Sequence, residues 1–195
     1  MRALFIFITI SILSLSTSFA QSQVSDFDFG FKGGLNLSRE SNSVGNSKLG
    51  VNLGAYAAYP LTNNLFVQAE MMYASQGERY KTEGIVFKDK LNYLHFPVMA
   101  KYYVADGLNL QFGPQLGFML VGKQKVGDTV TKANDKFNTV DFAFNFGAGY
   151  ELDNGLGFEV RYSLGVTGIK SSDIDPNQKN RVTQFMLTYK LSELF

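Results

Sequence analysis

The chain has 195 residues and a formal net charge of +1, and it contains no cysteine and no tryptophan. Without cysteine we expect neither a disulfide scaffold nor a lipoprotein anchor. A net charge so close to zero gives no overall field that favours nucleic acid or acidic partners.

The first 20 residues have the three-part layout of a secretory signal peptide. Arg2 precedes an apolar run over residues 3–15, and Ser18-Phe19-Ala20 stands before Gln21. A membrane-spanning helix would need roughly 20 apolar residues, and this run is shorter. The sequence therefore predicts a signal peptide over residues 1–20, cleaved after Ala20, and a single exported domain over residues 21–195.

After the leader, apolar and polar residues alternate with a period of two, which is the pattern of β-strands. The apolar faces of these segments run, in chain order, over Phe27–Leu37, Val51–Tyr59, Leu65–Tyr73, Leu94–Tyr102, Leu108–Leu120, Phe142–Leu152, Leu156–Val166 and Phe185–Leu191. No segment shows the 3.6-residue period of an amphipathic helix. The sequence therefore predicts eight strands.

The connections between these segments alternate between short and long. The short ones contain residues that tolerate positive φ, and they are Thr62–Asn64, Ala105–Gly107 and Asp153–Gly155. The long ones are polar and cover Arg39–Lys48, Glu78–Lys88, Gly122–Asn138 and Ile169–Lys179. This alternation is typical of an up-and-down barrel in an outer membrane, with turns on the periplasmic side and loops outside.

The composition of the two faces indicates which one meets lipid. The polar face is rich in Gly, Ala, Ser, Asn and Gln, whereas a solvated sheet usually carries long Lys and Glu side chains. The repeated glycines predict the crowding of a narrow barrel interior. The apolar face carries no Lys or Arg over about 9–11 residues, which is the length that a tilted strand needs to cross a bilayer.

Aromatic residues near the strand ends are typical of the girdles at the two membrane interfaces. They are Phe27, Tyr59, Tyr73, Tyr102, Tyr150 and Phe195. We therefore predict that the apolar face meets lipid and the polar face lines a lumen. A soluble lipocalin-like barrel is the alternative, and the lack of Trp, Cys and a helical segment counts against it.

The charges on the polar face are of both signs, and a closed lumen would let them pair. The candidate lumen polar network consists of Glu70, His95, Lys101, Asp141, Glu151, Glu159, Arg161 and Lys190. Glu159 and Arg161 are two residues apart on one face, which predicts an ion pair whose opening is one way to gate a pore. His95 is the only histidine, and we expect a structural rather than a catalytic role for it.

Two prolines fall inside the fourth and fifth predicted strands, where each removes an N–H from the ladder. If Val104 lies opposite Leu108 across the turn, then Val98 lies opposite Pro114, and Pro97 is one step away. Both gaps then fall at one level of one hairpin, which predicts a β-bulge there.

Four segments resemble a known family: "YLHFPVMAKYY" (Tyr93–Tyr103), "FGPQLGFML" (Phe112–Leu120), "NFGAGYEL" (Asn145–Leu152) and "VRYSLGVTGI" (Val160–Ile169). They are similar to the small eight-stranded outer-membrane β-barrels of the porin-like or PorT-like type. The resemblance covers the whole predicted mature chain, and it implies a fold rather than a chemistry. That family usually carries an acidic residue where His95 stands.

The last predicted strand resembles the signal that the barrel-assembly machinery reads in such barrels. Gln184, Tyr189 and Leu191 fit that signal, and a terminal Phe195 is typical of it, whereas Met186 stands where the signal has glycine. The resemblance implies that this machinery inserts the chain into the membrane.

We predict an all-β fold, an eight-stranded antiparallel up-and-down transmembrane β-barrel of the OmpA/OmpX-like kind, with a largely filled lumen. We expect it to be a monomer in the outer membrane. Two functions stay open: a structural or interaction role through the extracellular loops, surface- or secretion-associated, and a narrow porin that passes ions or very small solutes. An enzyme that acts on lipid or peptide is a third alternative, with His95 as its candidate residue.

The expected partners are outer-membrane lipid and lipopolysaccharide, the barrel-assembly machinery, and a protein of the surface or of a secretion system, with no nucleic acid. The third long loop has a mild basic excess, from Lys123, Lys125, Lys132 and Lys136 against Asp128 and Asp135. Contact with lipopolysaccharide phosphates is one interpretation of this excess, and a simply solvated loop is the preferred one. We predict no catalytic, cofactor-binding or metal site and no enzymatic activity.

Overall fold

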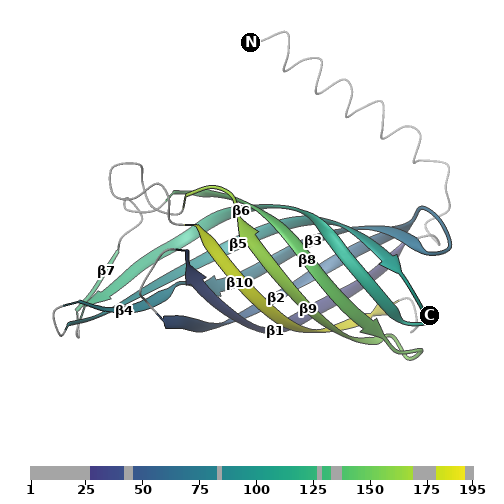
Figure 1. The fold of residues 1–195 in the computed structure, drawn as a ribbon, viewed down its shortest axis with the longest axis horizontal. Helices are drawn as coiled ribbons and strands as arrows, with labels where there is room; N and C mark the ends of the chain where they lie inside the picture. The colour runs from purple at the N-terminus through teal and green to yellow at the C-terminus, as the bar shows by residue number, and fades with distance from the viewer. Residues whose placement is uncertain are drawn as a thin grey trace, which may run out of the picture.

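The computed structural model describes residues 27–41, 46–82, 85–126, 129–132, 138–168 and 179–191. Its strands are β1 (Asp28–Glu40), β2 (Asn46–Pro60), β3 (Leu65–Gln76), β4 (Glu78–Thr82), β5 (Ile85–Tyr103), β6 (Leu108–Val126), β7 (Thr129–Lys132), β8 (Val140–Glu151), β9 (Leu156–Gly165) and β10 (Asn180–Lys190) (Figure 1). No helix within these ranges is long and apolar enough to cross a membrane. The predicted signal peptide and the terminal Phe195 lie outside the described residues.

Eight of these strands close into an antiparallel barrel (Figure 1). The ring runs β1–β2–β3–β5–β6–β8–β9–β10, and β10 pairs back with β1 from Gly30 opposite Lys190 to Glu40 opposite Asn180. β4 continues β3 along β5 beyond Gly77, and β7 pairs with β6. The predicted eight-stranded up-and-down barrel is therefore confirmed.

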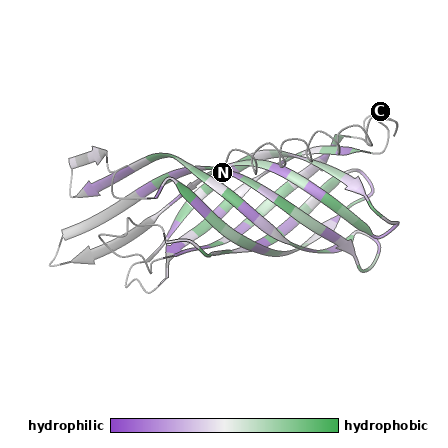
Figure 2. Ribbon diagram, turned by 90° about the horizontal axis from the view of Figure 1, so that it is seen from above, coloured by the Kyte–Doolittle hydropathy of each residue, from purple (hydrophilic) through white to green (hydrophobic). Residues whose placement is uncertain are grey.

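Apolar and polar side chains lie on opposite sides of the barrel wall, and hydrophobic and hydrophilic residues alternate along its strands in Figure 2. Large apolar side chains that are half exposed or more on the outside include Phe31, Leu53, Leu110, Phe158 and Leu187. Polar side chains buried in the lumen include Asn36, Gln68, Asn109, Gln111 and Gln184. A soluble lipocalin-like barrel would bury the apolar face, so this distribution contradicts that alternative and fits a barrel wall that faces lipid.

The predicted tight turns all lie at one end of the barrel. Gly107 and Gly155 take the left-handed backbone there, with φ of 73° and 80°. β1 begins at this end, with Asp28 opposite Ala58 next to the first turn. β10 ends there too, because the Lys190 N–H donates to the carbonyl oxygen of Gly155 at 2.8 Å. We call this end, defined by Thr62–Asn64, Ala105–Gly107 and Asp153–Gly155, the turn end, and the opposite end the hairpin end.

Two predicted loops at the hairpin end are partly strands. β5 begins at Ile85 and β6 ends at Val126, and β4 and β7 flank them as short extra strands. The described parts of the segments predicted as loops, over Glu78–Lys88 and Gly122–Asn138, are therefore largely paired strands that extend the barrel wall. The sequence pattern missed them because residues 78–88 and 122–138 have no regular apolar period, although the backbone ladder continues in their described parts.

The register of the β5–β6 hairpin is the predicted one. Tyr103 lies opposite Asn109, and Pro97 lies opposite Gln115, as the assumed pairing of Val104 with Leu108 requires. The predicted bulge at the prolines is wrong, because the register does not shift there. A proline removes one hydrogen bond without adding a residue, so the pairing resumes in the same register on either side.

The register shift lies further along the same hairpin. Tyr93 pairs with Met119, whereas Asn92 pairs with Val121, so Leu120 is the additional residue on β6. Leu120 and Val121 consequently both lie on the outer side of the wall before Gly122 is buried again.

Candidate functional site

Four charged side chains meet in the middle of the lumen. Lys32 from β1 donates to Glu70 Oε1 at 2.9 Å and to Glu159 Oε2 at 2.7 Å. Arg161 binds both oxygens of Glu70 at 2.8 Å and also donates to Glu159. We call Lys32, Glu70, Glu159 and Arg161 the central ion cluster; its two cations and two carboxylates give a net charge of zero.

Local sequence makes room for these long side chains. Arg161 lies opposite Gly147 and Glu159 lies opposite Gly149 on β8, so no neighbouring side chain on that strand competes for the space. Glu70 reaches the cluster from β3, on the far side of β2 from Lys32. The repeated glycines of the polar face therefore accommodate charged side chains in a narrow lumen.

The central ion cluster is shielded from solvent and both of its carboxylates are paired, while Arg161 Nε is buried without a hydrogen-bond partner among the described residues. None of its side chains is more than 3% exposed. Gln68 donates to Glu70 at 2.6 Å, and Arg161 donates to the side-chain oxygen of Gln111 at 3.1 Å. Buried charges are tolerated only when they are paired and hydrogen-bonded. The arrangement forms a neutral layer across the lumen, in which both carboxylates are already held by cations.

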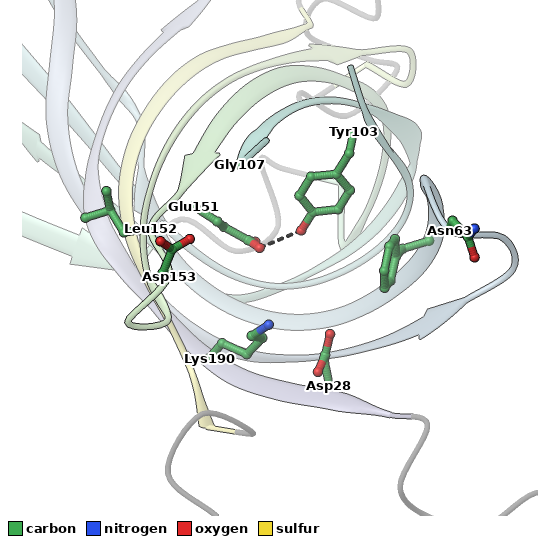
Figure 3. Close-up of a pocket in the computed structure, with 9 residues that line it drawn as sticks. Asp28, Asn63, Tyr103, Gly107, Glu151, Leu152, Asp153 and Lys190 are labelled. Atoms are coloured by element: carbon green, nitrogen blue, oxygen red, sulfur yellow. Dashed lines mark hydrogen bonds between the residues drawn. The ribbon is translucent and has the colours of Figure 1, made fainter. Parts of the chain in front are cut away.

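A second group lies at the turn end, where the lumen opens into a cavity of about 390 Å³ (Figure 3). Glu151 accepts hydrogen bonds from Lys101 and from the Tyr103 hydroxyl, and Figure 3 shows Glu151 and Tyr103 meeting across the mouth. The residues that line the cavity are Asp28, Asn63, Phe66, Tyr103, Gly107, Glu151, Leu152, Asp153 and Lys190. This mouth is polar and open to solvent.

The remaining two predicted residues lie toward the hairpin end. Asp141 accepts hydrogen bonds from Thr167 at 3.0 Å and from Asn180 at 3.4 Å. The imidazole of His95 is buried, and it stacks on Tyr93 with ring centroids 5.3 Å apart. The described ranges contain no group of three or more His, Cys, Asp or Glu placed to hold a metal ion.

The eight predicted residues thus fall into three groups rather than one network. The structure brings Glu70, Glu159 and Arg161 together in the central ion cluster, and it places Lys101, Glu151 and Lys190 at the mouth. Sequence reasoning missed Lys32 as a member. The sequence did contain an indication that Lys32 faces the lumen, because Lys32 stands on the polar face of the first predicted strand.

Gly117 gives a test of lumen packing. A Cβ at this position would lie 2.6 Å from Cδ2 of His95, whose ring is held by Tyr93. We expect Gly117→Ala to lower the free energy of unfolding by about 1–3 kcal/mol because it overpacks the lumen. The measurement is urea unfolding of the refolded protein in lipid.

Gly33→Ala is the matched control, because a Cβ there would be 3.3 Å from Leu53 Cδ1 on the lipid side. We expect it to change the free energy of unfolding by no more than about 0.5 kcal/mol. Equal stability of the two variants would contradict a crowded interior at Gly117.

No curated protein matches the chain significantly. A family model described as outer membrane protein beta-barrel domain matches residues 19–171. Neisserial surface protein A is similar in structure, with a TM-score of 0.52 and 13% identity over 84% of this chain and 96% of that protein. Ail, the attachment invasion locus protein of Yersinia pestis, gives a TM-score of 0.51 and 13% identity over 85% of this chain and 99% of Ail.

At these identities the two solved structures support the fold alone. The family match supports more than the fold, because it is a match of the sequence itself and covers more than half of the chain. Together with the closed barrel and its apolar outer wall, it places the protein in the outer membrane. The chain belongs to the outer membrane protein beta-barrel domain family.

Proposed function

We propose that this protein is a barrel with a largely filled lumen that acts through its hairpins, in a structural or interaction role, rather than as a pore. The observation that supports this proposal is the central ion cluster. It engages side chains from β1, β3 and β9 in a lumen that is only wide enough for side chains. A solute would have to break several buried ion pairs to pass.

The hairpins at the other end support the interaction part of the proposal. β5 and β6 each run for 19 residues, which is longer than the roughly 9–11 residues that a tilted strand needs to cross the bilayer. In outer-membrane barrels the short turns face the periplasm, so the hairpin end faces outward. The extra length would present β4–β5 and β6–β7 to a protein at the cell surface or in a secretion assembly.

The proposal includes export through a cleaved signal peptide, insertion by the barrel-assembly machinery and a monomeric state. It also includes a non-catalytic role, because the only histidine is buried in the lumen, away from lipid and from external peptides. The narrower PorT-like resemblance stays a prediction.

Conductance in a planar lipid bilayer tests this function. The refolded protein should first migrate differently on a denaturing gel when unheated and when boiled, which establishes a folded barrel. We expect the folded wild-type protein to be silent, because the central ion cluster occupies the lumen. A variant in which Lys32, Glu70, Glu159 and Arg161 are all replaced by serine should conduct if it still folds, and it controls for the sensitivity of the assay.

Steady unitary steps from the wild-type protein would contradict the filled lumen. If those steps also changed when Glu159 or Arg161 alone was neutralised, the narrow porin would become the better account.

A further inference from the structure

His95 on β5 and Asp141 on β8 flank Gly117 on β6. Gly117 pairs with both residues in the ladder, so all three lie on the lumen face of the wall. A Cβ at Gly117 would lie 3.0 Å from the imidazole Nε2 of His95 and 3.5 Å from the Cβ of Asp141. The glycine therefore leaves out the side chain that would separate the other two, and the imidazole lies over it toward β8.

The Nε2 atom of His95 is buried and has no hydrogen-bond partner among the described residues. The side chain is only 1% exposed, and its ring stacks on Tyr93 with an angle of 20° between the two planes, which fixes the orientation of the imidazole. A buried polar atom without a partner costs free energy, so such an atom in a folded protein indicates a group that binds there.

Asp141 is a buried carboxylate whose hydrogen-bond donors are neutral. It is 5% exposed and accepts from the Thr167 hydroxyl at 3.0 Å and from the Asn180 amide at 3.4 Å. Among the described residues no lysine or arginine forms an ion pair with it. The central ion cluster is neutral within itself and supplies no further positive charge. A buried carboxylate requires a compensating charge, so a cation beside Asp141 would stabilise the folded barrel.

Thr167 holds the carboxylate in place. The Phe142 N–H donates to the Thr167 hydroxyl oxygen at 2.8 Å, and the hydroxyl in turn donates to Asp141. A carboxylate that binds a metal ion is usually fixed by such a hydrogen bond.

Asn180 offers a third ligand from β10. Its contact with Asp141 at 3.4 Å is long for a hydrogen bond to a carboxylate. Rotation of the amide by half a turn exchanges its nitrogen and oxygen and keeps its shape. The amide oxygen would then lie beside the carboxylate, where both oxygens can bind the same cation.

We propose that His95, Asp141 and Asn180 bind a divalent transition-metal ion of the zinc type inside the hairpin end of the lumen. An imidazole nitrogen combined with oxygen ligands suits Zn²⁺, whereas Mg²⁺ and Ca²⁺ prefer oxygen ligands alone. Three protein ligands leave the fourth tetrahedral position to water. The ion would enter from the hairpin end, because β8 begins at Val140, one residue before Asp141. This site goes beyond the function proposed above and does not depend on it.

The single histidine makes the test specific. The folded barrel, prepared in detergent without a polyhistidine tag, is titrated with zinc chloride by isothermal titration calorimetry. The imidazole nitrogens of uniformly ¹⁵N-labelled protein are followed by NMR in the same titration. We expect one zinc ion per barrel and a shift of the Nε2 resonance of His95 that is complete at the same ratio. Magnesium chloride at equal concentration should cause neither change.

Two variants each remove one ligand. His95→Phe keeps a ring that can stack on Tyr93, and Asp141→Asn keeps the size of the side chain. We expect each variant to bind zinc at least about tenfold more weakly than wild type, because even the loss of a residue that only orients a ligand has an effect of this size. Asn180→Asp should bind zinc more tightly, because a carboxylate replaces an amide oxygen. Asp106→Asn is the matched control, since Asp106 is exposed in the turn between β5 and β6, and it should bind zinc like wild type.

The gel-mobility shift on boiling establishes that each variant is folded, and the wild-type NMR titration tests the site without any substitution. Unchanged zinc binding in His95→Phe or Asp141→Asn would overturn the proposal, as would an equal loss in Asp106→Asn, because zinc would then bind surface carboxylates. No gain in Asn180→Asp would overturn the assignment of Asn180 as a ligand. An imidazole that ignores zinc and carries a proton on both nitrogens at neutral pH would also overturn the proposal, because a proton would then compensate Asp141.

Discussion

Replacing Glu70 by leucine is expected to lower the free energy of unfolding by about 3–5 kcal/mol. Glu70 accepts hydrogen bonds from Lys32, Arg161 and Gln68 in a part of the lumen that water does not reach. Its removal leaves two buried cations facing the single carboxylate of Glu159. The measurement is urea unfolding of the refolded barrel in lipid vesicles, followed by the shift in gel mobility.

Glu151→Leu is the matched control for this prediction, because it also removes a carboxylate that is paired with a lysine, in this case Lys101 at the turn end. The Glu151 side chain is 18% exposed, so water can replace the lost contact with Lys101. We expect a loss of only about 1–2 kcal/mol. Equal losses at the two sites would contradict the distinction between a dry cluster and a wet mouth.

A double variant tests whether charge balance is the cause. Glu70→Leu combined with Arg161→Met restores neutrality and leaves Lys32 paired with Glu159. Apolar replacement of a whole buried ion pair is often nearly neutral, so we expect the double variant to be more stable than Glu70→Leu alone. Additive losses would mean that Glu70 contributes through packing and not through its charge.

Arginine on the lipid-facing wall is expected to destabilise the barrel more strongly the deeper it lies in the bilayer. We predict that Val98→Arg lowers the free energy of unfolding by about 2–4 kcal/mol, because the charge enters the middle of the hydrocarbon core. Leu120→Arg, near the hairpin end of the apolar band, should cost about 0–1 kcal/mol.

These two positions form a matched pair, because the exposed fractions of Val98 and Leu120 are 48% and 50%. Burial within the protein therefore cannot account for a difference between them. Urea unfolding in vesicles of one lipid composition measures both variants. Equal costs would contradict a bilayer around this wall, and equal costs near zero would indicate water.

The sequence predicted the fold well because lipid and lumen impose opposite demands on alternate residues. The alternation along β8, for example, assigns Phe146 to the outside and Asn145 to the lumen, as the structure has them. Where lipid ends, that constraint ends too. The outer parts of β5 and β6 were therefore predicted as loops.

The bulge was misplaced for a related reason. A proline removes a backbone hydrogen bond, whereas a bulge requires an additional residue in one strand. In the sequence, an additional residue shows as a break in the alternation of apolar and polar residues. Leu120 and Val121 are consecutive apolar residues at the point where the apolar face changes parity. This break was visible in the sequence and is the better indicator of the register shift.

Membership of the central ion cluster was harder to predict. Glu159 and Arg161 are two residues apart, and their pairing follows from the strand period alone. Lys32 and Glu159 are 127 residues apart in sequence. Contacts across a lumen depend on the shear of the closed barrel, which the pairing of single hairpins does not determine.

The seam between β1 and β10 has a consequence for how the chain reaches its native state. The first strand of the barrel pairs with the last, β10, so ring closure carries the largest loop-closure entropy of any pairing between the described strands. Until then β1 and the growing end of the sheet are open edges, which are prone to pair with other chains. The central ion cluster, which joins Lys32 to β9, is likewise completed only when the ring closes. Its ion pairs therefore stabilise the closed barrel and not the partly assembled sheet.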